Sequence, residues 1–177
     1  MRVCVACVLA LPCLLLATTV TPVSVEELTR NSSHIVEALA AESWARWNPQ
    51  HTFIYTYTRF QVSASLKGNS PSTLIVKQLG GSAEGYTQKI AGVHAWRSGE
   101  KAVLFLRPSI DVDGSFEITG LMQGNFVIHT LSTGEAVVSN GLPASSRQAS
   151  PNKAGAFRGS TMRLQELESR VRQAVER

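Results

Sequence analysis

Four histidines are the first residues to consider for chemistry, because imidazole can act as a metal ligand and as a general base. They stand at positions 34, 51, 94 and 129, as His34, His51, His94 and His129. None of them has the His-x-x-x-His or His-x-His spacing of a metal site, and no carboxylate stands beside one in the pattern of a zinc protease. The sequence therefore predicts no metal centre and no cofactor.

A glycine-rich segment is the nearest match to a catalytic serine motif. In Gly80-Gly81-Ser82-Ala83-Glu84, Glu84 replaces the last glycine of the Gly-x-Ser-x-Gly nucleophile elbow, and no clear helix follows. The segment also lacks the Gly-Lys-Ser/Thr ending of a phosphate-binding loop. A structural turn is the simpler interpretation. The alternative is a hydrolase whose site is built from His94, Glu84 and Ser82 in the 81–99 loop.

Two aspartates resemble the beginning of a calcium loop. Asp111 and Asp113 match its first two ligands, but Ser115 holds the third ligand position and Phe116 stands where the tight-turn glycine belongs. Gly114 tolerates positive φ, so we expect a hairpin tip here. No catalytic residue is assigned from these motifs.

Aromatic residues offer a different kind of chemistry, since aromatics on loops of a small domain often form binding surfaces. Trp44 and Trp47 flank Arg46 just before Asn48-Pro49, and a second group lies in the Gly81–Gly99 loop. The candidate binding residues are Trp96, Tyr86, His94, Trp44 and Trp47. The other interpretation places Trp44 and Trp96 in the core, and the sequence leaves both open.

The elements that position these residues are expected to be mainly strands. Residues 52–66 alternate two faces rich in aromatic and β-branched side chains, as a pleated strand prefers. Residues 34–41 are ambiguous, because Ala, Glu and Leu favour a helix. Further strands are expected at 73–79, 101–106, 115–119, 125–131 and 135–139. This spacing predicts an all-β domain over 22–141, a small antiparallel barrel of OB-like type.

Helices are expected before and after this domain. Ser24 and Glu27 fit a capping box at the start of a short helix, about residues 25–30. Residues 142–159 are rich in Ser, Pro, Ala and Gly and read as a linker. Over 160–177, Leu164, Leu167 and Val171 form an apolar stripe at helical spacing. Docking of this helix on the barrel is favoured over docking into another protein.

The N-terminal segment, residues 1–21, is typical of a secretory signal peptide. Arg2 precedes roughly 15 uncharged, mostly apolar residues, which is short for a membrane span. All three cysteines, Cys4, Cys7 and Cys13, lie within it. We therefore expect an exported chain, periplasmic or extracellular, that after processing has no disulfide and no stable membrane span.

Charge limits the class of partner. The formal net charge is +4, but residues 24–142 carry nine basic and ten acidic side chains, so the basic excess lies in the tail. A uniformly basic surface of the kind that binds nucleic acid is absent from this pattern. The expected partner is an envelope or extracellular protein and not a nucleic acid.

Several short motifs carry a family resemblance over about residues 25–139. They are Ser33 with Ile35 and Val36, Leu66-Lys67-Gly68, Gly80-Gly81, Gly99-Glu100 ahead of Val103–Leu106, and Gly120-Leu121-x-Gln123-Gly124-x-Phe126. With them the chain resembles a broad group of uncharacterised bacterial exported proteins. That group is similar in architecture to the OB-like barrel of tissue inhibitors of metalloproteinases. Those inhibitors present a free N-terminal cysteine to the protease metal, and the processed chain has none, so the resemblance implies the fold and not the inhibition.

Together these observations predict an exported, non-catalytic binding or protein-interaction module. Its ligand-facing surface is expected in the Trp96 loop, joined by Trp44 and Trp47. The alternative functions are the hydrolase described above and an accessory subunit whose C-terminal helix docks into another protein.

Overall fold

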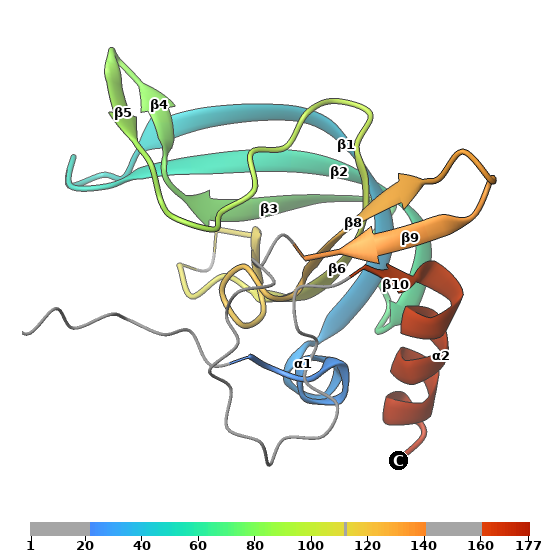
Figure 1. Ribbon diagram of the computed structural model, residues 1–177. Helices are drawn as coiled ribbons and strands as arrows, with labels where there is room; N and C mark the ends of the chain where they lie inside the picture. Colours follow the sequence, from blue (N-terminus) through green and yellow to red (C-terminus); the bar gives the residue numbers. More distant parts are fainter. Residues whose placement is uncertain (1–21, 112, 141–160) are drawn as a thin grey trace, which may run out of the picture.

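The computed structural model describes residues 22–111, 113–140 and 161–177, and within them the chain is mainly β (Figure 1). A large sheet is accompanied by a small hairpin and two helices. The elements, in order, are α1 Val25–Asn31, β1 His34–Trp47, β2 Ile54–Lys67, β3 Thr73–Leu79, β4 Gly81–Ala83, β5 Tyr86–Gln88, β6 Lys101–Pro108, β7 Phe116–Ile118, β8 Asn125–Thr130, β9 Ala136–Ser139, β10 Met162–Arg163 and α2 Leu164–Val175. The predicted signal peptide, residues 1–21, and the predicted linker, residues 142–159, lie outside the described residues.

The helix α1 begins where the capping pattern predicts. The Ser24 hydroxyl accepts a hydrogen bond from the Glu27 amide at 3.1 Å, which satisfies one of the free N–H groups of the first turn. At the other end, the Ser32 hydroxyl lies 2.7 Å from the carbonyl of Leu28 and 2.8 Å from Thr119 Oγ1. The helix is therefore held at both ends, and its side chains Val25 and Leu28 are buried.

The ambiguous segment after α1 is a strand and not a helix. β1 is 14 residues long and pairs antiparallel with β2 along most of its length. Its first part, His34 to Leu39, also pairs antiparallel with β6. Ladder hydrogen bonds on two sides outweigh the modest helix preference of Ala, Glu and Leu, which amounts to a few tenths of a kcal/mol per residue.

The main sheet has eight strands in the order β1-β2-β3-β7-β6-β8-β9-β10, and β1 pairs with β6 as well. All of its ladders are antiparallel except one. That exception is the single parallel pair between Val76 of β3 and Phe116 of β7. β4 and β5 form a separate hairpin within the segment expected to be a long loop, so this part of the Gly81–Gly99 prediction is corrected.

Two apolar cores share the central strand β6. Ala102, Leu104 and Leu106 face the first core, which lies between β1, β2, β3 and β6. Val103 and Phe105 face the second core, under the two helices. A strand that is buried on both faces needs an uninterrupted apolar run, and this explains why Ala102 to Leu106 shows no alternation.

The helix α2 docks on the body of the protein, as its apolar stripe predicts. Leu167 and Val171 are fully buried in the second core with Val25 and Phe126. The helix is shorter than the expected 160–177, because Met162 and Arg163 pair with β9 as a short strand before it begins. No helix in the described ranges is long and apolar enough to cross a membrane.

Candidate functional site

Trp96 is a core residue, which is one of the two placements that the sequence leaves open. Its side chain is 6% exposed and belongs to the first core. The indole N–H donates to Gln78 Oε1 at 2.8 Å, and the ring meets Phe60 edge-on with 5.0 Å between centroids. A buried indole with its polar atom satisfied is a packing element. The Trp96 ring is therefore not available as a ligand-facing surface.

His94 lies beside Trp96 and is tied to a carboxylate. Its ring centroid lies 4.5 Å from that of Trp96, and its Nε2 lies 2.9 Å from Glu100 Oε2. The same carboxylate oxygen accepts a hydrogen bond from the Arg97 amide. Burial raises the pKa of Glu100, but the hydrogen bonds from Arg97 and His94 outweigh it, so the pKa is lowered overall. These contacts close the turn between Arg97 and Glu100.

Ser82 and Glu84, the other members of the hydrolase alternative, lie on the β4–β5 hairpin. Ser82 Oγ bonds across the hairpin to Thr87 Oγ1 at 2.8 Å. Glu84 and Gly85 form its two-residue tip, with φ of 53° and 83°, as a type I′ turn requires. Among the described residues no hydrogen bond joins Ser82 to His94 or to Glu84. The structure therefore does not assemble the base–nucleophile contact that a hydrolase needs.

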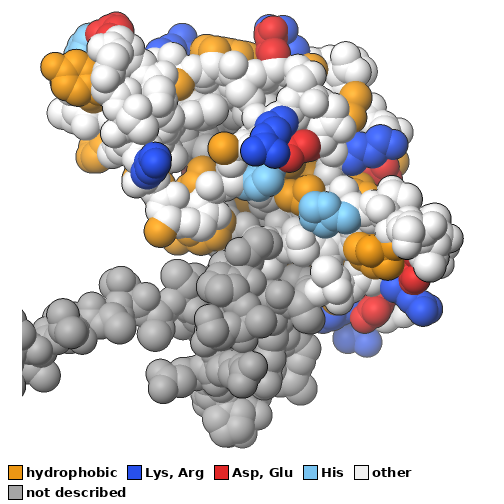
Figure 2. Space-filling model, turned by 45° about the horizontal axis from the view of Figure 1, so that its top comes forward, with side chains coloured by type: hydrophobic (Ala, Val, Ile, Leu, Met, Phe, Trp, Pro, Cys, Tyr) orange, Lys and Arg blue, Asp and Glu red, His pale blue; other side chains and the backbone are white. Residues whose placement is uncertain are grey.

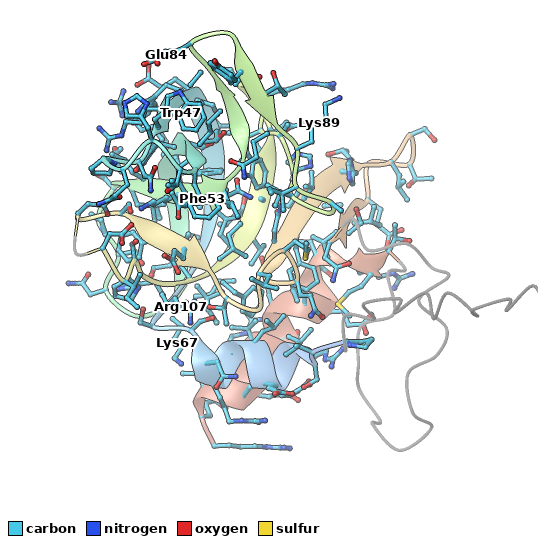
Figure 3. All side chains as sticks on the ribbon, turned by 90° about the vertical axis from the view of Figure 1, so that its left-hand side faces the viewer. Trp47, Phe53, Lys67, Glu84, Lys89 and Arg107 are labelled. Atoms are coloured by element: carbon cyan, nitrogen blue, oxygen red, sulfur yellow. The ribbon has the colours of Figure 1, made fainter. Side chains whose placement is uncertain are left out.

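A second group of aromatic rings does come together, at the far end of β1. Trp47 stacks on His51 with 5.6 Å between centroids and meets Tyr86 of β5 edge-on at 5.7 Å. Phe53 lies in the same β1–β2 connection and is 46% exposed, while Tyr86 is 66% exposed. We call Trp47, His51, Phe53 and Tyr86 the terminal aromatic cluster. Figure 3 labels Trp47 and Phe53 at this end, with Glu84 at the hairpin tip above them.

The β1–β2 connection that carries this cluster is internally bonded. Asn48 Oδ1 accepts hydrogen bonds from the amides of Thr52 and Phe53, at 2.8 and 3.0 Å. Asn48 Nδ2 also donates to Thr52 Oγ1 at 2.8 Å. One side chain thus fixes the whole turn between the two long strands. His51 and Phe53 were not among the sequence candidates, and their place at the edge of an Asn-Pro turn was the signal available.

The β4–β5 hairpin reaches the cluster because glycine permits a close crossing. Gly81 has φ of 134°, and a Cβ there would lie 2.9 Å from the Cβ of Ala45. Only a residue without a side chain can pass over β1 and β2 this closely. The Gln88 side chain then anchors the returning strand by accepting the Ile54 amide at 2.9 Å. The glycine-rich motif is therefore a crossing point and not a nucleophile elbow.

Trp44 lies on the outer face of β1, away from the first core. Its ring stacks on Tyr57 of β2, with 5.9 Å between centroids and 13° between planes. The guanidinium of Arg46 lies 4.4 Å over the Tyr57 ring, and that of Arg59 lies 5.6 Å from the Trp44 ring. Arg59 also forms an ion pair with Glu42. The outer face of β1 and β2 thus alternates rings and charges.

Lys77 on β3 extends this outer face and is the ion-pair partner of Asp111 and Asp113. Its side chain is 6% exposed, lies 4.2 Å over the Tyr55 ring, and pairs with Asp111 and more distantly with Asp113. Burial lowers the pKa of Lys77, but the hydrogen bond and negative charge of Asp111 outweigh it and raise the pKa overall. The hairpin tip between β6 and β7 is therefore tied to β3 by a lysine.

The histidines and carboxylates do not gather into a metal site in the described ranges. His34 contacts Ser70, and His129 lies near Ser139, on different parts of the sheet. A hollow of about 240 Å³ opens along β1 and β2, with Glu37 and Lys101 in its wall and no aromatic side chain. It is small for a ligand pocket, which usually measures about 300 Å³ or more.

On the face of the molecule that Figure 2 shows, most exposed acidic side chains lie next to basic ones. The same view shows hydrophobic side chains at the corner where the β4–β5 hairpin lies. The five sequence candidates thus separate into three places: the terminal aromatic cluster with Trp47 and Tyr86, the outer face with Trp44, and the core with Trp96 beside His94. No protein-family model matches this chain, and no curated protein matches it.

Proposed function

We propose that this protein is an exported, non-catalytic binding module that contacts its partner through the terminal aromatic cluster. The observation that carries the proposal is the ring of Tyr86, which is 66% exposed and meets the ring of Trp47 edge-on. Phe53, which is 46% exposed, lies in the adjoining β1–β2 connection. Large aromatic side chains are enriched at the energetic centres of protein interfaces, where they bury a large area and lose few rotamers. The partner we expect is an envelope or extracellular protein.

Preorganisation supports this surface. The Asn48 side chain fixes the β1–β2 turn, and the ring of Trp47 is held between His51 and Tyr86. A surface that is already ordered loses less conformational entropy on binding, so more of the contact energy remains as affinity. A loose loop carrying the same residues would bind more weakly.

The proposal that the protein is non-catalytic is supported by the hydrogen-bond partners of the residues in the hydrolase alternative. Glu100 holds His94, and Thr87 holds Ser82. The hydrolase alternative would require His94 and Ser82 to exchange these partners for one another. Nothing in the geometry favours that rearrangement.

We further infer that the main sheet curls into an OB-like barrel. The pairings β1-β2-β3-β7-β6 return to β1, and the first core lies among these strands. The circuit depends on the single parallel pair Val76–Phe116. A five-stranded barrel of this kind is often partly open and binds ligands on its strand faces and connecting loops. This inference agrees with the resemblance to exported proteins with an OB-like barrel.

Export is the remaining part of the proposal and is supported by the apolar, uncharged run after Arg2. N-terminal sequencing of the protein recovered from outside the cytoplasm tests it. Processing that begins the mature chain between about residues 18 and 23 is expected. Recovery of the unprocessed chain in the cytoplasm alone would contradict it.

Site-specific crosslinking tests the binding surface. A photoreactive benzophenone amino acid replaces Tyr86 in one variant and Leu131 in a control, because Leu131 is an exposed apolar residue outside the cluster, at the β8–β9 turn. Irradiation in the producing cells is expected to give a discrete adduct from position 86, and a weak or absent one from position 131. The adduct should disappear when Trp47→Ala is added. Equal labelling from both positions, or none from position 86, contradicts the proposal.

A further inference from the structure

The strand β1 changes its neighbours halfway along its length. Its ladder with β6 ends at the pair Leu39–Lys101, and the turn before β6 adds two backbone bonds to Ala40. From there to Trp47, β1 pairs with β2 alone. On the side away from β2, no strand in the described ranges pairs with residues 41–47. Figure 1 shows this half of β1 above β2 and β3, with the β4–β5 hairpin at its end.

The hydrogen-bond pattern identifies which backbone groups point to this free side. The Asn48 amide donates to the carbonyl of Phe53, so this pair bonds across the hairpin. In the next pair, Ile54 bonds away from β1, to Gly80 and to the Gln88 side chain. In an antiparallel ladder, pairs that are hydrogen-bonded to each other alternate with pairs whose backbone groups point outward. In β1 the residues whose N–H and C=O groups point away from β2 are therefore Ser43, Ala45 and Trp47. These groups form a free edge.

The side chains along this edge are arranged symmetrically about Trp44. Glu42, Trp44 and Arg46 all lie on the outer face, with Glu42 and Arg46 each two residues from Trp44. Arg46 lies over the ring of Tyr57 and forms no ion pair with the described residues. If an identical strand approaches antiparallel with Trp44 opposite Trp44, each Glu42 lies opposite an Arg46 of the other copy. The odd-numbered residues, whose backbone groups face outward, then pair with one another.

We propose that two copies of this protein associate through the free edges of β1, antiparallel and centred on Trp44. Charges on an edge strand normally protect it from pairing. Charges of a single sign would do so here, whereas Glu42 and Arg46 are one acid and one base at equal distances from the centre. Glu42 also pairs with Arg59 of its own chain, but its side chain is 53% exposed and can meet the Arg46 of a second copy. Directly opposite charges and aromatic rings each stabilise an antiparallel pair by about 0.2–1 kcal/mol. The dimer joins the two main sheets edge to edge into one continuous sheet, with both outer faces on the same side.

This association goes beyond the proposed partner, because it uses the backbone edge and the outer face of β1, whereas the partner contacts side chains of the terminal aromatic cluster. Trp47 contributes its backbone to the first surface and its ring to the second. An extended peptide of another protein could use the same backbone groups, but it would have no reason to reproduce the charge symmetry of Glu42 and Arg46. Reversing the charges at Glu42 and Arg46 in different copies therefore distinguishes a second copy of this protein from a foreign peptide at the free edge.

Sedimentation of the processed protein over a range of concentrations tests the proposal. The wild type is expected to dimerise reversibly. Glu42→Arg and Arg46→Glu should each raise the dimer Kd by at least about tenfold, since each places like charges opposite one another twice. An equal mixture of the two variants should recover the dimer, because every acid then meets a base. Arg172→Glu on the exposed side of α2, far from β1, serves as the control for net charge.

A proline provides the matched test of the backbone. Ala45→Pro removes an N–H that points to the free edge and leaves the bonds to β2 in place, so it is expected to give a folded monomer. Trp44→Pro removes an N–H that bonds to β2 and is expected to lower the unfolding midpoint. A wild type that is monomeric at every concentration overturns the proposal. So does a dimer that survives Ala45→Pro, or a mixture that does not recover.

Discussion

Arg170 of α2 donates two hydrogen bonds to the Glu26 carboxylate of α1, from Nε to Oε1 at 2.8 Å and from Nη2 to Oε2 at 2.9 Å. The two residues are 144 positions apart in the sequence. Both side chains are partly buried, and Leu167 and Val171 pack beneath them against Val25. The bidentate geometry fixes one helix on the other. α2 is therefore part of the folded body.

Removing this pair should make the stability depend less on pH. The hydrogen bonds from Arg170 lower the pKa of Glu26 below its usual 4.5. A carboxyl group whose pKa is lower in the folded protein than in the unfolded chain stabilises the fold at pH values above its unfolded-state pKa. This stabilisation is lost as the pH falls through the folded-state pKa. Glu26→Gln should therefore cost about 1 kcal/mol at neutral pH and almost nothing in strong acid. Urea unfolding at several pH values measures this. Glu166→Gln, at an exposed position of α2, serves as the matched control for the loss of one carboxylate.

The burial of α2 predicts a large cost for truncating its apolar face. Leu167 is fully buried, so Leu167→Ala should lower the free energy of unfolding by about 2–4 kcal/mol. Val175 on the same helix is 46% exposed, and Val175→Ala should change it by less than about 0.5 kcal/mol. Denaturant unfolding of the two variants is the measurement. Equal effects would mean that α2 does not dock as described.

Trp96 should behave as a structural residue when it is replaced. Trp96→Ala removes a buried ring and leaves Gln78 without its donor, so a loss of about 3–5 kcal/mol is expected. Trp96→Phe keeps most of the packing and should cost about 1–3 kcal/mol, chiefly for the unpaired Gln78 oxygen. Thermal unfolding and crosslinking from position 86 are measured together. If Trp96→Phe abolished the adduct without lowering the midpoint, the assignment of Trp96 to the core would be refuted.

Lys77 should be the least reactive lysine of the described chain. Its amine is buried, and Asp111 holds its pKa above the usual 10.5, so the nucleophilic neutral form is scarce. Acetylation with limiting reagent, read by mass spectrometry, should label the exposed Lys89 well before Lys77. Asp111→Asn should speed the labelling of Lys77 and leave Lys89 unchanged. Equal rates in the wild type would contradict the tie between β3 and the β6–β7 hairpin.

Elements with a strong local signal could be predicted from the sequence. The capping box located α1, the alternation located β2, and the apolar run located β6. β1 was ambiguous because its Ala and Leu residues prefer a helix, and only pairing with distant strands decides against that preference. The β4–β5 hairpin was missed because Glu84 and Gly85 do not form one of the usual Asn-Gly or Asp-Gly turns.

The candidate site divides in the same way. Their aromatic side chains and their expected positions on loops or strand ends drew attention to Trp47, Tyr86 and Trp96, but their burial depends on contacts between segments far apart. Trp96 is buried because Gln78 and Phe60 reach it from other strands. Tyr86 meets Trp47 because Gly81 lets the chain cross close to β1. No local pattern predicts such contacts.

The most direct test of the binding proposal uses the partner captured from position 86. Its affinity is measured for the purified wild type, for Trp47→Ala with Tyr86→Ala, and for Leu131→Ala as a control at an exposed apolar position outside the cluster. We predict that the double variant loses at least about tenfold in affinity while its unfolding midpoint remains close to that of the control. If the double variant binds as tightly as the control, the terminal aromatic cluster is not the binding surface.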